Sequence, residues 1–421
     1  MKKIKASILI FLMAIIYPIS VYTISSIDYS ILPILPKNET LSTNAGARYN
    51  DSLYGDQWAM PTVGAHLAHA MNVTGKNLTN PSDPIVVAVC DTGIDTNHPD
   101  LVGNIIGNIS FVPEEALGED YNGHGTHCAG IIAATMNNTR GIVGVAPEAK
   151  IRAYKVLNRS GEGEIDYLRQ AIDDIVANYP PNKSDGLGVN VISMSLGVFI
   201  EDYDALSPAK KLVYENLNSS INNAYAAGII LLAAAGNNKK GIVCYPAAFP
   251  NVLAITAVDV FQHRASYSNW GPEVNYTAPG GDLWNDFFLV GVLSTYKGGG
   301  YAYMAGTSMA TPVAAGVVAL LFGNGTHHTN ITKELTARAK PKGAPGWDPV
   351  FGDGLVQIVA SDFDYKDWFW DHYMLDVLLV YYTLFGAYLE PETEINWVMW
   401  AIIGGVIAFF AVIAIYEMRA R

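Results

Sequence analysis

Residues 85–95 read IVVAVCDTGID, a continuous apolar run that ends in a polar turn. A short run rich in β-branched residues is typical of a strand that is covered on both faces, as in a parallel sheet. Further strands are expected at 189–194, 229–233 and 252–257, and helices from about residue 125, at 167–178 and at 210–227. This alternation predicts an α/β fold: a mostly parallel sheet with helices on both faces and functional groups at the carboxyl ends of the strands.

Three polar segments place complementary chemical groups in this framework. Asp91 follows the first predicted strand, His124 lies in NGHGTHCAG (122–130), and Ser308 lies in GTSMATP (306–312). A serine hydroxyl becomes a nucleophile when a base is within hydrogen-bond reach, and an imidazole base needs a carboxylate on its other nitrogen. Asp-Thr-Gly is also typical of aspartic proteases, but these need two acids that share a proton, and no second such segment occurs.

These ordered motifs resemble the subtilisin-like serine proteases, in which the triad follows the chain order Asp, His, Ser. The resemblance covers roughly residues 49–361, and its motifs read more like the thermitase branch. It extends through the segments YGDQW (54–58), HPDL (98–101), GVAP (144–147), SMSLG (193–197), AAGN (234–237), ASYSN (265–269) and FGDGL (351–355). The resemblance implies a serine endopeptidase that works through an acyl-enzyme.

The family resemblance implies a role for each motif residue. Ser308 is the expected nucleophile, and His124 is the expected base and later the acid for the leaving amine. Asp91 is expected to orient His124, and Asn237 to supply a side-chain amide to the oxyanion hole. An extended peptide is expected to pair with the chain as added β-strands. The implied substrate-binding residues are Ser160, Gly161, Ser195, Leu196, Gly197, Ala234, Ala235 and Gly236.

The resemblance also implies a structural calcium ion. The thermitase-like site combines acidic side chains, an Asn amide and loop carbonyls, and such oxygen ligands suit a hard cation. The expected ligands are Asp51, Asp100, Met136, Asn138, Arg140 and Ile142. The alternative is a solvated loop without metal, because Asn50 and Asn137 begin sequons and could carry glycans beside the site. No cofactor is expected in catalysis.

Composition excludes several classes of protein. Half of the 421 residues are hydrophobic and 15% are charged, so a disordered chain is excluded. The formal net charge is −13 and no long Lys/Arg cluster occurs, so nucleic acid is an unlikely partner. Three cysteines permit at most one disulfide, which excludes a disulfide scaffold.

Both ends of the chain predict contact with a membrane. Residues 1–26 hold three lysines followed by an apolar run, the layout of a secretory signal, although an uncleaved anchor stays open. Residues 397–416 carry no charge, and as a helix they would span roughly 30 Å of bilayer. Glutamates precede this span and arginines follow it, which predicts a cytoplasmic tail at 417–421 and an extracellular body.

The remaining segments follow from these assignments. Residues 49–362 form the predicted catalytic domain, and the extension at 27–48 is too short for an ordinary folding prodomain. Residues 363–396 are an aromatic juxtamembrane segment. Asn-x-Ser/Thr with a residue other than Pro at x occurs twelve times, against about three expected by chance, which indicates a glycoprotein unless it reflects Asn richness. The substrate, the oligomeric state and the breadth of specificity stay open; a narrow processing protease of a secretion or surface-assembly pathway and a catalytically silent surface protein are the alternatives.

Overall fold

The computed structural model describes residues 49–181, 187–284 and 288–361. Its helices are α2 (Ala59–Thr62), α3 (Ala65–Ala70), α4 (His124–Ala133), α5 (Ile165–Asn178), α6 (Pro208–Ala226), α7 (Thr307–Gly323) and α8 (Ile331–Arg338), with 3-10 turns η3 (Tyr54–Asp56) and η4 (His328–Asn330). Its strands are β1 (Val86–Asp91), β2 (Ile105–Ser110), β3 (Lys150–Lys155), β4 (Val191–Met194), β5 (Ile230–Ala234), β6 (Val252–Val258), β7 (Val274–Pro279), β8 (Asp282–Trp284), β9 (Phe288–Val290), β10 (Val292–Tyr296) and β11 (Gly300–Met304).

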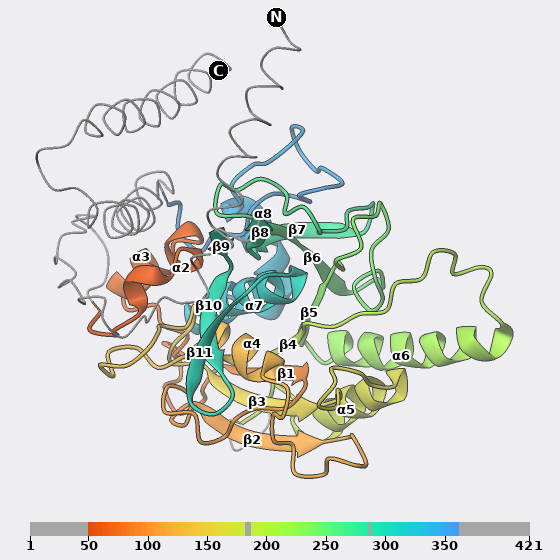
Figure 1. Ribbon diagram of the computed structural model, residues 1–421, viewed down its shortest axis with the longest axis horizontal. Helices are drawn as coiled ribbons and strands as arrows, with labels where there is room; N and C mark the ends of the chain where they lie inside the picture. Colours follow the sequence, from red (N-terminus) through yellow and green to blue (C-terminus); the bar gives the residue numbers. More distant parts are fainter. Residues whose placement is uncertain (1–48, 182–186, 285–287, 362–421) are drawn as a thin grey trace, which may run out of the picture. The chain divides into compact units, whose positions relative to one another are not determined.

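Seven strands form one parallel sheet in the order β2-β3-β1-β4-β5-β6-β7 (Figure 1). Two short antiparallel pairs, β8–β9 and β10–β11, lie outside it. The predicted mostly parallel sheet is confirmed, and the four predicted apolar runs correspond to β1, β4, β5 and β6. Because the strands are parallel, their carboxyl ends share one edge, and the predicted functional segments follow them there.

Each face of the sheet packs against its own pair of long helices. Along β1, Val87 and Val89 belong to the core that includes α4 and α7. Val86, Ala88 and Cys90 alternate with them and belong to the core that includes α5 and α6, which lie side by side in Figure 1. This alternation explains why the run is apolar at every position: both faces of the strand are buried.

The start of α4 is held by one buried carboxylate. Asp120 accepts hydrogen bonds from the Gly123 and Thr126 backbone N–H groups and from the Thr126 hydroxyl, so it satisfies donors that the helix leaves unpaired. It also accepts a 2.8 Å hydrogen bond from the Thr92 hydroxyl, at the end of β1. Asp120 therefore ties the first turn of α4 to the strand that carries Asp91.

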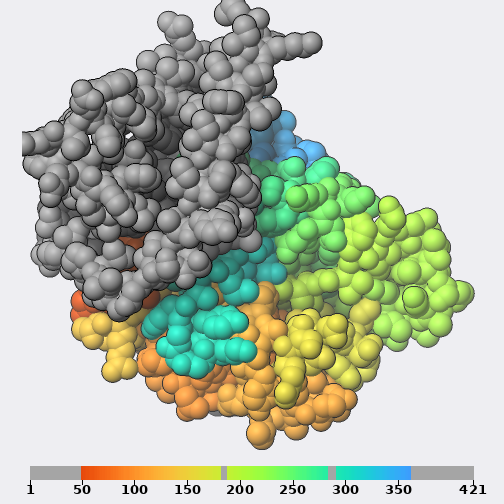
Figure 2. Space-filling model, viewed as in Figure 1, coloured from red at the N-terminus to blue at the C-terminus, as the bar shows by residue number. Residues whose placement is uncertain are grey.

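The β10–β11 hairpin braces α4 from the other side. The Ser294 hydroxyl donates to the His127 carbonyl and the Thr295 hydroxyl to the Thr126 carbonyl, each at 2.7 Å. In Figure 2 the teal surface of this part of the chain lies against orange surface from the part of the chain before α4. The Lys297 ammonium at the tip of the hairpin donates to the Tyr121 carbonyl.

No helix within residues 49–181, 187–284 and 288–361 is long and apolar enough to cross a bilayer. The predicted signal at 1–26, the extension at 27–48, the juxtamembrane segment at 363–396, the span at 397–416 and the tail lie outside the described residues.

A buried ion pair lies below the carboxyl end of β1. Lys155 is fully buried, and its ammonium lies 2.9 Å from Glu115 Oε2 and donates to the Thr92 carbonyl. Glu115 Oε1 accepts a 2.9 Å hydrogen bond from Arg159 Nε. Burial alone would raise the pKa of Glu115, but the hydrogen bonds from Arg159 and the charge of Lys155 outweigh it and lower the pKa to about 2.

This lowered pKa makes a pH-dependent contribution to stability. A carboxyl with a depressed pKa in the folded state stabilises it above the unfolded pKa of about 4.5, and that contribution disappears as pH falls toward about 2. At pH 7 we expect Glu115→Gln to lower the free energy of unfolding by about 3 kcal/mol, because Lys155 loses its buried partner. The difference from the parent should shrink between about pH 4.5 and pH 2.

The measurement is urea denaturation in a Ser308→Ala background, which prevents self-digestion. The matched control is Glu114→Gln, which neutralises the exposed neighbouring acid. A Glu115→Gln penalty that stays constant across this pH range would contradict the assignment.

Candidate active site

Asp91, which is buried, and His124, which is half-buried, form a hydrogen-bonded pair. Asp91 is the last residue of β1 and is fully buried, and His124 is the first residue of α4. His124 Nδ1 donates to Asp91 Oδ1 at 2.7 Å, and the same oxygen accepts the Thr92 N–H. This arrangement leaves His124 Nε2 as the nitrogen that can accept a proton.

The environment of His124 favours its protonated form. Burial alone would lower its pKa, but the charge of Asp91 outweighs burial, and the pKa of His124 lies well above its ordinary value. Cys128 follows one turn later on α4, with its sulfur 3.9 Å from His124 Nδ1. Burial raises the pKa of this thiol, so Cys128 packs beside the imidazole as a neutral group.

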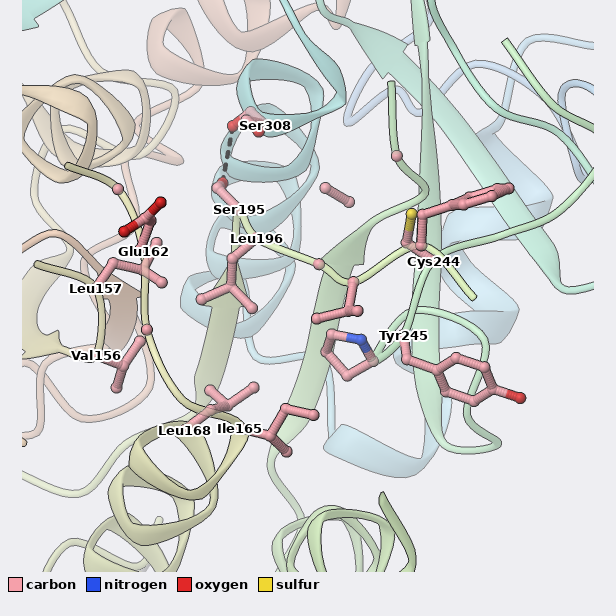
Figure 3. Close-up of a pocket in the computed structure, with 18 of the residues that line it drawn as sticks. Val156, Leu157, Glu162, Ile165, Leu168, Ser195, Leu196, Cys244, Tyr245 and Ser308 are labelled. Carbon is pink, nitrogen blue, oxygen red and sulfur yellow. Dashed lines mark hydrogen bonds between the residues drawn. The ribbon is translucent and has the colours of Figure 1, made fainter. Parts of the chain in front are cut away.

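Ser308 is the second residue of α7, and several side chains hold the start of that helix. Asn237 Oδ1 accepts from both the N–H and the hydroxyl of Thr307, at 3.0 and 2.9 Å. Ser195 Oγ donates to the Ser308 carbonyl at 2.8 Å (Figure 3), and Cys128 Sγ contacts the same carbonyl at 3.6 Å. Because its oxygen is used in this way, the amide nitrogen of Asn237 is available to another acceptor.

His124, Ser308 and Asn237 open into one cavity of about 670 Å³. In the described chain no hydrogen bond joins Ser308 Oγ to His124; such contacts are often loose in the absence of substrate. Six of the predicted substrate-binding residues line this cavity: Gly161, Ser195, Leu196, Gly197, Ala234 and Gly236.

Two predicted substrate-binding residues do not line the cavity. Ala235 is fully buried in the core between the sheet and α5–α6, and its backbone N–H bonds the Ile255 carbonyl. Ser160 lies on the exposed turn beside the cavity, where its N–H donates to Asn158 Oδ1. Both residues are next in sequence to residues that line the cavity. They differ from these neighbours in the direction in which the chain points them, and not in their place along the chain.

The cavity also contains residues that the sequence analysis did not single out. They lie in the segments that connect β3, β4 and β5 to the next elements, or at the start of α5, so the rule that ligands lie beyond strand ends could have found them. They include Leu157, Glu162, Glu164, Ile165, Leu168, Phe199, Asn238, Cys244 and Tyr245.

The predicted metal ligands lie together at a second site, apart from the cavity beside Ser308. Both Asp51 oxygens accept backbone N–H bonds, from Asn137 at 2.8 Å and Asn138 at 3.1 Å. Asp100 accepts from the Asn138 amide at 2.6 Å and from the Ile142 N–H at 3.0 Å. Burial raises the pKa of both acids. The other predicted ligands share the loop that holds Asn138: Met136, Arg140 and Ile142.

The carboxylate oxygens of this second site suit a hard cation. In the described chain neither Asp51 nor Asp100 forms an ion pair with Lys or Arg, although both carboxylates are buried. Two carboxylates from different segments supply the oxygen ligands that calcium prefers, while Asn138 turns its amide nitrogen toward Asp100 and its oxygen toward the Arg140 N–H.

Comparison with known proteins agrees with the geometry. The Subtilase family model matches residues 82–354. Subtilisin Savinase of Lederbergia lenta is 38% identical over 306 residues, which are 72% of this chain and 97% of that protein. M-protease of Shouchella clausii is 38% identical over 304 residues, 72% of this chain and 69% of its own length. Thermitase of Thermoactinomyces vulgaris is 38% identical over 245 residues, 58% of this chain and 77% of that protein. The chain therefore belongs to the subtilase family, and it is a subtilisin-like serine endopeptidase.

Proposed function

We propose that this endopeptidase is anchored in a membrane, faces the exterior, and cleaves polypeptides with Asp91, His124 and Ser308 as its triad and Asn237 in its oxyanion hole. The observation that carries the catalytic assignment is the 2.7 Å hydrogen bond between Asp91 and His124 at the rim of the cavity that Ser308 enters. A buried carboxylate that orients an imidazole beside a helix-start serine is suited to acyl transfer.

The first half of the reaction moves one proton. Ser308 Oγ attacks the peptide carbonyl carbon while His124 Nε2 takes the hydroxyl proton, and Asp91 stabilises the resulting imidazolium. The carbonyl oxygen becomes an oxyanion, which the Asn237 amide and the Ser308 N–H stabilise, with help from the positive end of α7. The carbon–nitrogen bond then breaks, and His124 returns the proton to the leaving amine.

The second half repeats these steps with water. The acyl group is held as an ester on Ser308, and His124 takes a proton from the attacking water. The intermediate collapses, the ester bond breaks, and His124 reprotonates Ser308 Oγ. Enzyme and carboxylic acid product are left, so every group returns to its starting state.

The triad assignment predicts unequal losses of activity. We expect Ser308→Ala to fold normally and to retain less than about a hundredth of the parent turnover. Asn237→Ala should lower kcat by about 10² to 10³ with little change in KM, because the amide acts mainly on the transition state. Peptide hydrolysis kinetics measure both effects, with Ser219→Ala on the exposed face of α6 as control.

Labelling with a serine-directed fluorophosphonate separates this function from a catalytically silent surface protein. The label should be found on Ser308 by mass spectrometry and should be absent from Ser308→Ala. Turnover of Ser308→Ala close to that of the parent, or a label elsewhere, would contradict the assignment.

We also propose that Asp51, Asp100 and Asn138 hold a structural calcium ion, with the carbonyls of Met136, Arg140 and Ile142. The ion would neutralise two buried carboxylates and hold the N-terminal segment against the loop at 136–142. Because the ion binds only the folded chain, it would stabilise that state.

Chelation should therefore lower the thermal midpoint. Excess EDTA is expected to reduce the Tm of the Ser308→Ala protein, calcium to restore it, and magnesium to restore it poorly because it requires tighter octahedral geometry. Asp100→Asn should abolish the response, whereas Asp204→Asn at an exposed position should preserve it. An unchanged melting curve in excess chelator would contradict the proposed calcium site.

The membrane part of the proposal rests on residues 1–26 and 397–416. A chain ending before Trp397 should carry its activity in the soluble fraction, while the full chain should stay with membranes after alkaline extraction. Whole cells should cleave an impermeant peptide, because the catalytic domain is proposed to face outward. Full-length protein that is extracted like the truncated form would argue against an anchor.

A further inference from the structure

The cavity beside Ser308 carries fixed charge of one sign. Glu162 and Glu164 are the only Asp, Glu, Lys or Arg side chains among its described lining residues, and both are exposed to solvent. In the described chain neither carboxylate has an ion pair or a side-chain hydrogen bond. Two free carboxylates thus face a cavity whose described lining contains no Lys or Arg side chain to balance them.

The backbone around Glu162 is held rigidly. Asn158 Oδ1 accepts the Ser160 and Glu162 N–H groups at 2.8 and 3.1 Å, and the Asn158 N–H donates to the Glu162 carbonyl at 2.7 Å. Gly161 completes the turn at a φ of +79°, in the left-handed region that glycine adopts easily. The turn therefore presents Glu162 at a fixed place on the rim.

Glu164 occupies the N-cap position of α5 without using its side chain as a cap. The shorter side chains of Ser, Thr, Asp and Asn are the ones that commonly cap a helix from this position. Here the carboxylate stays available, while the start of the helix brings it to the same wall of the cavity as Glu162.

Below the two acids the cavity is apolar. Figure 3 shows Glu162 and Leu157 on one wall, Leu196 on the opposite wall, and Ile165 and Leu168 beneath them. Lysine and arginine side chains commonly lay their aliphatic stems on apolar surface and keep the charged end near water and carboxylates. An apolar floor with an acidic rim matches both parts of such a side chain.

We propose that Glu162, supported by Glu164, is a specificity-determining residue that selects polypeptides with an arginine or lysine at a fixed position near the scissile bond. This inference rests on the proposed function, because it takes the cavity to be the substrate cleft. The net charge of −13 adds long-range attraction for cationic chains. An acidic side chain at the same substrate position would be repelled.

The test compares two fluorogenic peptides that differ only in charge. A positional scanning library first finds where arginine is preferred, and paired peptides then carry arginine or citrulline there. Citrulline has nearly the same shape without the charge. We expect the full-length protein to show a kcat/KM ratio of about ten in favour of arginine, about 1.4 kcal/mol. The ratio should fall with added salt.

The variants locate the source of that ratio. Glu162→Gln should reduce it, Glu162→Gln with Glu164→Gln should bring it close to one, and Glu162→Arg should favour an acidic residue at that position. Glu215→Gln, which removes an exposed acid from α6 outside the cavity, should keep the parent ratio. This control makes the same change in net charge.

The outcomes separate the two proposals. A protein that is labelled at Ser308 and cleaves both peptides equally overturns the inference and leaves the proposed function standing. A preference for arginine that survives in the double variant also overturns it. A protein that takes no label at Ser308 and cleaves neither peptide overturns the proposed function itself.

Discussion

The hydrogen bond between His124 and Asp91 joins the first residue of α4 to the last residue of β1. Contacts on two sides of α4 hold these two elements in place. Asp120 bonds both of them, through Thr92 at the strand end and Thr126 in the helix. The β10–β11 hairpin holds α4 on its other side. An imidazole acts as an efficient base only when its ring is oriented, so this bracing connects the packing of one helix to the chemistry proposed for Ser308.

The parallel sheet assembles the cleft from distant parts of the chain. Strands β3, β1, β4 and β5 are neighbours, and their carboxyl ends lie at one edge. The turn after β3 supplies the acidic rim, the segment after β4 supplies Ser195 and Leu196, and the segment after β5 supplies Asn237. Helix α7 then brings Ser308 to the same place. Four separate segments of the chain thus meet in one cleft.

The partners of the carboxylates discussed above depend on how deeply each carboxylate is buried. Glu115 is buried and is paired with Lys155, because a buried charge without a partner is costly. Asp51 and Asp100 are buried, are satisfied in part by backbone N–H groups, and have the oxygen chemistry of a calcium site. Glu162 needs no partner because water reaches it, and for the same reason it is available to a substrate cation.

The sequence by itself determined the class of fold and the motif residues of the site. Strands buried on both faces are continuously apolar, which is why β1, β4, β5 and β6 were predicted, whereas β2 is only half-buried and β3 carries Arg152 and Lys155, so neither gives that signal. Only the tertiary structure decided which neighbouring residues face the cavity. Ala235 was expected in the cleft but points into the core, while Glu162 reaches the rim. Hydrophobic pattern is a local property, but the direction of a side chain at a strand end depends on how crossover connections place that end against the rest of the molecule.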